Sequence, residues 1–147
     1  MNGGVKISLK RSEGNTVYLI DANVLLEVLY KRSRWEESYK LLNKVKEGSI
    51  KALMLHFVIH GISAILGKPD LAAKPLAEIL SWRGLTIVDL SVSDELTACE
   101  IASRLGLDFD DGLHYHFAKT RNLSIISFDK DFDNLDIRRI EPHEITV

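Results

Sequence analysis

The chain has 147 residues, and its balance of 46% hydrophobic and 27% charged residues is typical of a soluble globular protein. This length suits one domain that buries a substantial core. A formal net charge of −2 argues against a strongly basic nucleic-acid-binding protein, although bound cations can offset a local acidic cluster. Cys99 is the single cysteine, so an internal disulfide and a CxxC metal site are both excluded.

The amino-terminal part of the chain carries no recognisable targeting signal. Residues 1–16 lack the apolar middle of a secretory signal, and no apolar run in the chain approaches the ~20 residues of a membrane span. We therefore expect a cytoplasmic protein without a membrane partner. Val5, Ile7 and Leu9 alternate with polar residues, which permits an added edge strand, whereas the neighbouring glycines favour a flexible extension. Residues 17–147 are expected to form one domain.

Apolar runs and helical patterns alternate along that domain. The best strand candidate is Val17–Ile20, a short apolar run that ends at Asp21. Further strands are predicted over residues 85–90, 124–128 and 137–140. Helices are predicted over residues 23–30, 35–47, 71–82, from a cap at Ser91 or Ser93 to Leu105, and 108–122.

Residues 52–66 are mostly apolar, and their periodicity does not separate a helix from a strand. Their length favours a buried helix, although Gly61 weakens this interpretation. Strands that alternate with helices imply a parallel sheet with helices on both faces. The predicted fold class is therefore α/β, a three-layer α/β/α sandwich around a central parallel sheet.

Acidic residues stand where the predicted strands end. Asp21 directly follows the first strand, Asp129 follows strand 124–128, and Asp110 and Asp111 open the helix before that strand. Because ligands of an open parallel sheet bind outside the carboxyl ends of its strands, these carboxylates are expected to converge. A hard cation such as Mg²⁺ prefers oxygen ligands and would offset their repulsion. Taken singly, Asp110 or Asp111 is equally well explained as a helix cap, and Asp129 as part of an acidic turn.

Three motifs, in this order, resemble those of the PIN domain family. The first is Tyr18–Leu25 (YLIDANVL), an apolar strand followed by Asp-x-Asn and a helix. The second is Phe109–Tyr115 (FDDGLHY), in which an aspartate opens a helix. The third is Ile125–Phe132 (IISFDKDF), a strand followed by Ser-x-Asp and an aromatic residue. The resemblance covers residues 17–147 and implies a PIN-like fold.

The resemblance also implies an activity, that of a metal-dependent endoribonuclease which hydrolyses RNA phosphodiesters with a metal-activated water. The residues it implies are Asp21, Asp111 and Asp129 as catalytic ligands of Mg²⁺ or Mn²⁺, Asp131 as a weaker ligand, and Asn23, Ser127 and Asp110 beside them. Asn23 and Ser127 would orient ligands or waters by hydrogen bonding. Many small members of the family are VapC-type toxins, which implies the toxin role in a toxin–antitoxin pair and a small antitoxin protein as partner.

The chain departs from the family at the position of its usual fourth acid. His60 stands where a glutamate is expected, and no acid occurs between Glu47 and Asp70. Three interpretations remain open. In the first, His60 is itself a ligand, with His56 one helical turn earlier, which favours Mn²⁺ or Zn²⁺. In the second, three aspartates suffice for activity. In the third, the site is degenerate, and the module binds RNA or a protein partner without cleavage.

Residues outside the acidic motifs suggest further contacts. Lys31, Arg32 and Arg34 are candidate RNA-binding residues, although a solvated loop explains them equally well. Leu25, Leu29 and the helix predicted over residues 35–47 suggest an exposed apolar surface for a homodimer or an antitoxin.

His114 lies one turn from Asp111 and suits either a general base or, more simply, a partner of the carboxylate or a residue of the cleft rim. A receiver-like phosphotransfer domain is a rival class. It requires a lysine at a later strand end, and Lys130 follows Asp129 too closely for that role.

Overall fold

A computed structural model describes residues 16–145, and in this part of the chain five strands alternate with six α-helices. All strand pairs are parallel, and the strand order is β3-β2-β1-β4-β5. The strands are β1 Val17–Ile20, β2 Lys51–Leu55, β3 Leu85–Val88, β4 Ser124–Ile126 and β5 Arg139–Ile140. The helices are α2 Ala22–Leu29, α3 Trp35–Glu47, α4 His56–Leu66, α5 Pro69–Leu80, α6 Val92–Leu105 and α7 Phe109–Arg121, with short 3₁₀ helices η2 Lys130–Asn134 and η3 Pro142–Glu144.

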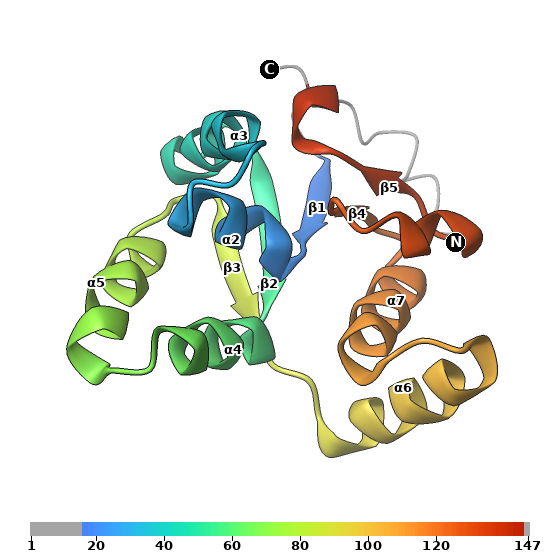
Figure 1. The fold of residues 1–147 in the computed structure, drawn as a ribbon. Helices are drawn as coiled ribbons and strands as arrows, with labels where there is room; N and C mark the ends of the chain where they lie inside the picture. The colour runs from blue at the N-terminus through green and yellow to red at the C-terminus, as the bar shows by residue number, and fades with distance from the viewer. Residues whose placement is uncertain (1–15, 146–147) are drawn as a thin grey trace.

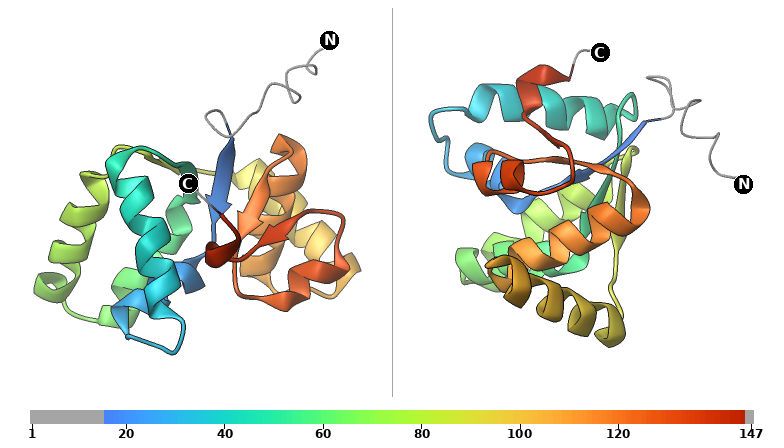
Figure 2. Two further views of the ribbon diagram at one scale, coloured as in Figure 1. Left: turned by 90° about the horizontal axis from the view of Figure 1, so that it is seen from above. Right: turned by 90° about the vertical axis from the view of Figure 1, so that its right-hand side faces the viewer.

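The helices form two layers around the sheet. Helices α2 to α5 lie on one side of β1, and α6 and α7 lie on the other (Figure 1; Figure 2, left). The prediction of an α/β/α sandwich with a central parallel sheet is confirmed. The expected amino-terminal extension falls on residues that lie, apart from Thr16, outside the described part of the chain. No helix within residues 16–145 is long and apolar enough to cross a membrane.

The core lies where the central strands meet both helix layers. Leu19, Ile20, Ile125 and Ile126 have no exposed surface, which explains why consecutive apolar residues, and not an alternating pattern, end β1 and β4. Helix α3 buries Leu41, Leu42 and Val45 against the same core and ends at Gly48, which adopts a left-handed conformation. The predicted bounds of α3 and β1 are confirmed.

The prediction of one buried helix over residues 52–66 is wrong. Lys51–Leu55 is a strand that pairs with β1 and β3, and α4 begins at the next residue, His56. Strand and helix follow each other without a loop. Leu55, the last residue of β2, has extended backbone angles and directly precedes the first residue of α4. No glycine or proline therefore marks the boundary in the sequence. The last strand is shorter than predicted and contains only Arg139 and Ile140.

A polar residue follows the carboxyl end of every strand. These residues are Asp89 after β3, His56 after β2, Asp21 after β1, Ser127 after β4 and Glu141 after β5. Because all five strands are parallel, these ends share one edge of the sheet. The chain builds the sheet outward from β1 in one direction and then resumes with β4 on the other side, so the topological switch point lies between β1 and β4.

Candidate metal centre

Three carboxylates gather at the switch point. Asp111, Asp129 and Asp131 each offer an oxygen, and these oxygens all lie within 4.8 Å of one another. Asp129 and Asp131 follow β4 in the chain, whereas Asp111 comes from the first turn of α7. Asp21 stands at the end of β1, near enough for its charge to contribute to the raised pKa of Asp111. The structure thus brings together three of the four aspartates that the sequence predicted as ligands, with the fourth, Asp21, beside them.

Asp21 is nearly buried, with 8% of its surface exposed, and is held on several sides. Its backbone N–H donates to the carbonyl of Ile126 at 3.0 Å, which continues the β1–β4 pairing. Its Oδ2 accepts a hydrogen bond from Ser127 Oγ at 2.6 Å and one from Asn23 Nδ2 at 3.3 Å. A buried charge needs such partners, and these bonds fix the orientation of the carboxylate.

Ser127 is fully buried and connects Asp21 to Asp129. Its hydroxyl donates to Asp21 and accepts from the backbone N–H of Asp129 at 3.0 Å and from Asn23 Nδ2 at 3.2 Å. Asn23 Oδ1 in turn accepts from the N–H of Phe128 at 3.3 Å. One network therefore holds the end of β1 and the loop after β4 in a fixed relation.

Asp111 is positioned by a residue that the sequence interpretation missed. Asp108 caps α7, and its Oδ1 accepts a hydrogen bond of 2.8 Å from the N–H of Asp111. An aspartate three residues before Asp111, at the start of a helical pattern, is the signal that identifies it. Burial and then the charges of Asp108, Asp129, Asp21 and Asp131 raise the pKa of Asp111 to about 7. Burial, followed by the charge of Asp108, also raises the pKa of Asp110.

This arrangement fits a divalent cation. The donors at the switch point are carboxylate oxygens, which hard cations such as Mg²⁺ prefer. Burial is the main cause of the raised pKa of Asp111, and the charges of four neighbouring aspartates add to it, so the surroundings disfavour the ionised form of this carboxyl. A bound dication would supply positive charge. The cluster can therefore hold a metal and expose it at the place where open α/β sheets bind their ligands.

The two histidines singled out in the sequence lie in different surroundings. His114 is 1% exposed, its Nδ1–H donates to the carbonyl of Asp110 at 3.1 Å, and the same nitrogen lies 3.9 Å from Asp21 Oδ1. It is therefore a partner of the acidic site and does not lie at a cleft rim. His60 is exposed, and its ring lies 4.7 Å from that of His56. Within residues 16–145, His60 belongs to no group of three residues whose potential metal-ligand atoms lie close together.

One of the three cations of the basic loop, Arg34, is already engaged by other side chains. The guanidinium of Arg34 pairs with Glu37 and Glu141 and stacks 4.5 Å from the ring centre of Phe128. Lys31 and Arg32 are exposed and lie over the rings of Trp35 and Tyr30, at 5.5 and 5.4 Å. Only Lys31 and Arg32 thus present cations that are not already paired with carboxylates.

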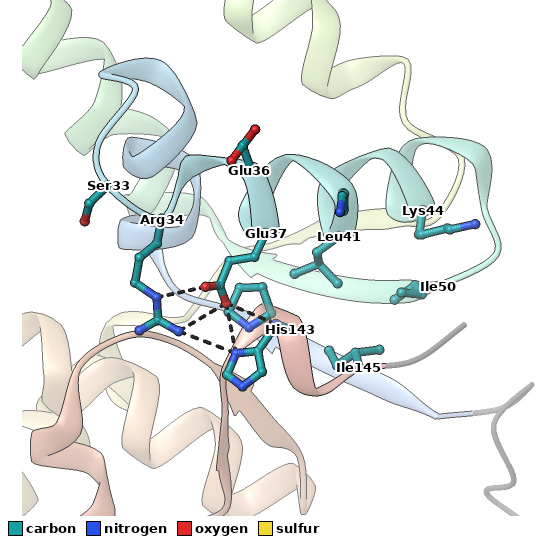
Figure 3. Close-up of a pocket in the computed structure, with 11 residues that line it drawn as sticks. Ser33, Arg34, Glu36, Glu37, Leu41, Lys44, Ile50, His143 and Ile145 are labelled. Carbon is teal, nitrogen blue, oxygen red and sulfur yellow. Dashed lines mark hydrogen bonds and ion pairs between the residues drawn. The ribbon is translucent and has the colours of Figure 1, made fainter.

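A second group of potential ligands, Glu37, Glu141 and His143, lies where α3 meets the segment after β5. Glu37 and His143 line a pocket of about 550 Å³ (Figure 3). Arg34 and Arg139 already pair with Glu141, and they lower the pKa of Glu141 to about 2. Arg139 also donates to the carbonyl of Ser127 at 3.0 Å. This arginine–carboxylate cluster therefore fastens the carboxyl-terminal segment to α3 and to the metal centre.

Of the two leucines expected to form an exposed apolar surface, only Leu29 is exposed. Leu25 is buried, with 5% of its surface exposed, so the expectation that it is exposed is wrong. It packs inward because it belongs to the core-facing side of α2, whereas Leu29, near the end of the helix, is 37% exposed. Both contribute to an apolar groove of about 550 Å³ between α2, α3 and α5, whose wall includes Tyr39 and Trp82.

Comparison with known proteins agrees with this geometry. The structure is similar to that of VapC20 from Mycobacterium tuberculosis, a toxin that cleaves the sarcin–ricin loop, with a TM-score of 0.67 and 15% identity over 83% of this chain and 96% of that chain. It is also similar to a toxin–antitoxin complex from Klebsiella pneumoniae, with a TM-score of 0.66 and 15% identity over 87% and 99% of the two chains.

VapBC2 from Rickettsia felis, bound to a DNA fragment from its promoter, is similar with a TM-score of 0.64 and 15% identity over 86% of this chain and 98% of that chain. No curated protein sequence matches the chain. The sequence model of the PIN domain matches residues 18–138, which include all three acidic motifs. The chain therefore belongs to the PIN domain family.

Proposed function

We propose that this PIN domain is a metal-dependent endoribonuclease that acts as the toxin of a toxin–antitoxin pair. The observation that carries the proposal is the convergence of Asp111, Asp129 and Asp131 within 4.8 Å, beside Asp21 at the switch point. Hydrolysis of a phosphodiester needs positive charge at the phosphate and an activated water, and a bound Mg²⁺ or Mn²⁺ supplies both.

Some residues of the chain are proposed to bind the ion, and others to hold these ligands in position. Asp21, Asp111 and Asp129 are the proposed catalytic ligands, and Asp131 completes the cluster. Ser127 fixes Asp21 and the backbone of Asp129 at once, so a single hydroxyl sets the spacing of two ligands. Preorganised ligands of this kind lower the free energy that is needed to order the site when metal and RNA bind.

RNA is the proposed substrate because the structurally similar VapC20 is described as cleaving the sarcin–ricin loop. Lys31 and Arg32, exposed on the connection between α2 and α3, are the proposed phosphate contacts. Arg34 is not a phosphate contact in this proposal, because its guanidinium is paired with Glu37 and Glu141. It supports the loop after β4 through Phe128 and Glu141.

The proposed protein partner is a small antitoxin. Two of the similar structures are toxin–antitoxin complexes, from Klebsiella pneumoniae and Rickettsia felis. The apolar groove that Leu29, Tyr39 and Trp82 border offers such a partner surface to bury. A homodimer through the same region is the competing use of this surface, and the mass of the purified chain in solution, measured by light scattering, tests for it.

A second function is favoured by one observation. His60 replaces the expected fourth acid, and it lies outside the convergent carboxylates. A domain that lacks the fourth acid would bind RNA or a protein partner without cleaving RNA. The proposed metal site retains three convergent aspartates with Asp21 beside them, so we place cleavage first.

The test is cleavage of a mixed single-stranded RNA by the purified full chain, with Mg²⁺ or Mn²⁺ and with EDTA. Asp129→Asn is the site variant, and Asp70→Asn, an exposed aspartate at the start of α5, is its matched control. We expect metal-dependent cleavage that falls about 100-fold or more in Asp129→Asn and is unchanged in Asp70→Asn. Absence of cleavage by folded protein with either metal would support the non-catalytic function. Equal cleavage by both variants would refute the assignment of Asp129.

A further inference from the structure

Residues that follow strands β2 and β3 form a cluster that the proposed nuclease does not use. His56 and His60 lie on the first turns of α4, and Asp89 and Glu95 come from the connection between β3 and α6 and from α6 itself. We propose that this cluster is a second metal site, for a borderline cation such as Zn²⁺. Its ligands are His56, His60 and Glu95, and Asp89 orients His56.

The two histidines are placed as a metal-binding pair. They are four residues apart on one helix, so their side chains share a face, and their ring centres lie 4.7 Å apart. Imidazole nitrogens at this spacing suit Zn²⁺, Ni²⁺ or Co²⁺ much better than Mg²⁺, which prefers oxygen. Both rings border one cavity of about 230 Å³.

Asp89 supports His56 in the way that outer carboxylates support metal-bound histidines. His56 Nδ1 lies 2.7 Å from Asp89 Oδ1, so the Nδ1–H donates to the carboxylate and the lone pair is directed to Nε2. This hydrogen bond fixes the tautomer and the orientation of the ring. It leaves Nε2 as the nitrogen available for a cation.

Glu95 supplies the third ligand. It borders the same cavity as the two histidines, and no hydrogen bond or ion pair engages its side chain among the described residues. The three ligand atoms do not already lie within 4.8 Å of one another, but His60 is exposed and Glu95 is half-buried, so changes of rotamer can bring them together. Glu95 and Asp89 together carry two negative charges, which balance a dication.

The arginine–carboxylate cluster around Glu37, Glu141 and His143 shows why the second site is not placed there. Its ligand atoms are closer together, but Arg34 and Arg139 already occupy the carboxylates with charged hydrogen bonds. A cation would have to displace these arginines. In the described part of the chain, no lysine or arginine pairs with Asp89 or Glu95.

The proposed site is also separate from the carboxylates at the switch point. Phe57, next to His56 in α4, packs its ring 5.1 Å from that of His114, which in turn partners Asp110 and Asp21. Within residues 16–145, no group of three converging ligand atoms combines His56 or His60 with the aspartates. The two sites differ in donor chemistry, so we expect Mg²⁺ to select the carboxylates and Zn²⁺ the histidines.

Binding of Zn²⁺ to tag-free, EDTA-treated full-length protein tests the proposal by titration calorimetry. Asp129→Asn serves as the background, because it weakens the acidic cluster and leaves the histidines in place. We expect one Zn²⁺ per chain, about 100-fold weaker binding in His56→Ala/His60→Ala, and a 10- to 100-fold loss in Asp89→Asn. His116→Ala, a partly buried histidine elsewhere on α7, is the matched control and should bind as the background does.

A second measurement locates the ion directly. In NMR spectra of the histidine rings, Zn²⁺ should shift the resonances of His56 and His60 and leave those of His116 unchanged, whereas Mg²⁺ should move neither. Unchanged Zn²⁺ affinity in the folded double variant would overturn the proposal. So would Zn²⁺ binding that leaves the His56 and His60 resonances in place.

Discussion

The hydroxyl of Ser127 lies 2.6 Å from Oδ2 of Asp21, although 106 residues separate the two in the chain. The same hydroxyl accepts the backbone N–H of Asp129. Two of the proposed metal ligands therefore depend on one buried side chain that has no negative charge of its own. Because β1 and β4 are neighbours in the sheet, this bond crosses the switch point.

Replacing Ser127 by alanine removes these contacts without removing a ligand. We expect the affinity for Mn²⁺ to fall about 10- to 100-fold, as for other residues that orient metal ligands. We also expect the free energy of unfolding to fall by about 1–3 kcal/mol, because the carboxylate of Asp21 loses a buried donor. Calorimetric titration and urea unfolding measure the two effects. Ser49→Ala, which removes one exposed hydroxyl, should change neither, and normal Mn²⁺ affinity in Ser127→Ala would contradict the positioning role.

The raised pKa of Asp111 predicts an unusual dependence of stability on pH when metal is withheld. The folded chain keeps a proton on Asp111 up to pH of about 7, whereas the unfolded chain loses it near pH of about 4. The folded state therefore binds more protons across this window, and its stability falls as the pH rises. We expect Asp111→Asn to be more stable than the unaltered chain by about 1 kcal/mol above pH 7 in EDTA, the small value reflecting solvent screening of a half-buried group.

Urea unfolding at pH 5 and pH 8, with and without Mg²⁺, measures this effect of Asp111. The advantage of Asp111→Asn should shrink at pH 5 and reverse when Mg²⁺ is added, because only the aspartate binds the ion well. Asp70→Asn provides the comparison at each pH. If Asp111→Asn were less stable than the unaltered chain at pH 8 in EDTA, the conclusion that burial and neighbouring charges destabilise the ionised Asp111 would be wrong.

The lowered pKa of Glu141 predicts the opposite dependence of stability on pH. Arg34 and Arg139 lower its pKa from the ordinary 4.5 to about 2, so its contribution to stability is complete above pH of about 4.5 and is lost as the pH falls toward 2. We expect Glu141→Gln to unfold more easily at pH 7 by about 3 kcal/mol, because two arginines lose a shared buried partner. Thermal unfolding from pH 7 to pH 2 should show the difference shrinking in acid. Glu47→Gln, an exposed change on α3, should show none of this.

Replacing glycine by alanine should have opposite effects on the free energy of unfolding at two helical positions, Gly112 and Gly61. A Cβ on Gly112 would lie 2.6 Å from the Cβ of Ala102, where α7 packs against α6, whereas a Cβ on Gly61 meets nothing within 4 Å. We expect Gly112→Ala to lower the free energy of unfolding by about 2 kcal/mol through overpacking. Gly61→Ala should raise it by about 0.5–1 kcal/mol, because alanine loses less backbone entropy in a helix. Urea unfolding of the pair measures both, and destabilisation by Gly61→Ala would show that α4 is not a regular exposed helix there.

Local pattern determined most of the elements of this protein. The run Val17–Ile20 and the helix of residues 35–47 follow from apolar spacing and, for the helix, from Gly48, and the structure has the same bounds. The parallel sheet followed from the alternation of strands and helices. The prediction of one helix over residues 52–66 was wrong because a buried strand and a buried helix have the same apolar composition. Only the pairing of Lys51–Leu55 with β1 and β3 identifies the strand.

The sequence alone also named the acidic residues, since parallel strands place whatever follows them at one edge. Only the tertiary structure decided what each side chain does there. It showed that Arg34 is already paired with carboxylates, that Leu25 faces the core, and that His60 stands with His56 and not among the aspartates. Burial and ion pairing depend on which distant segments meet in space, and no local spacing along the chain contains that information.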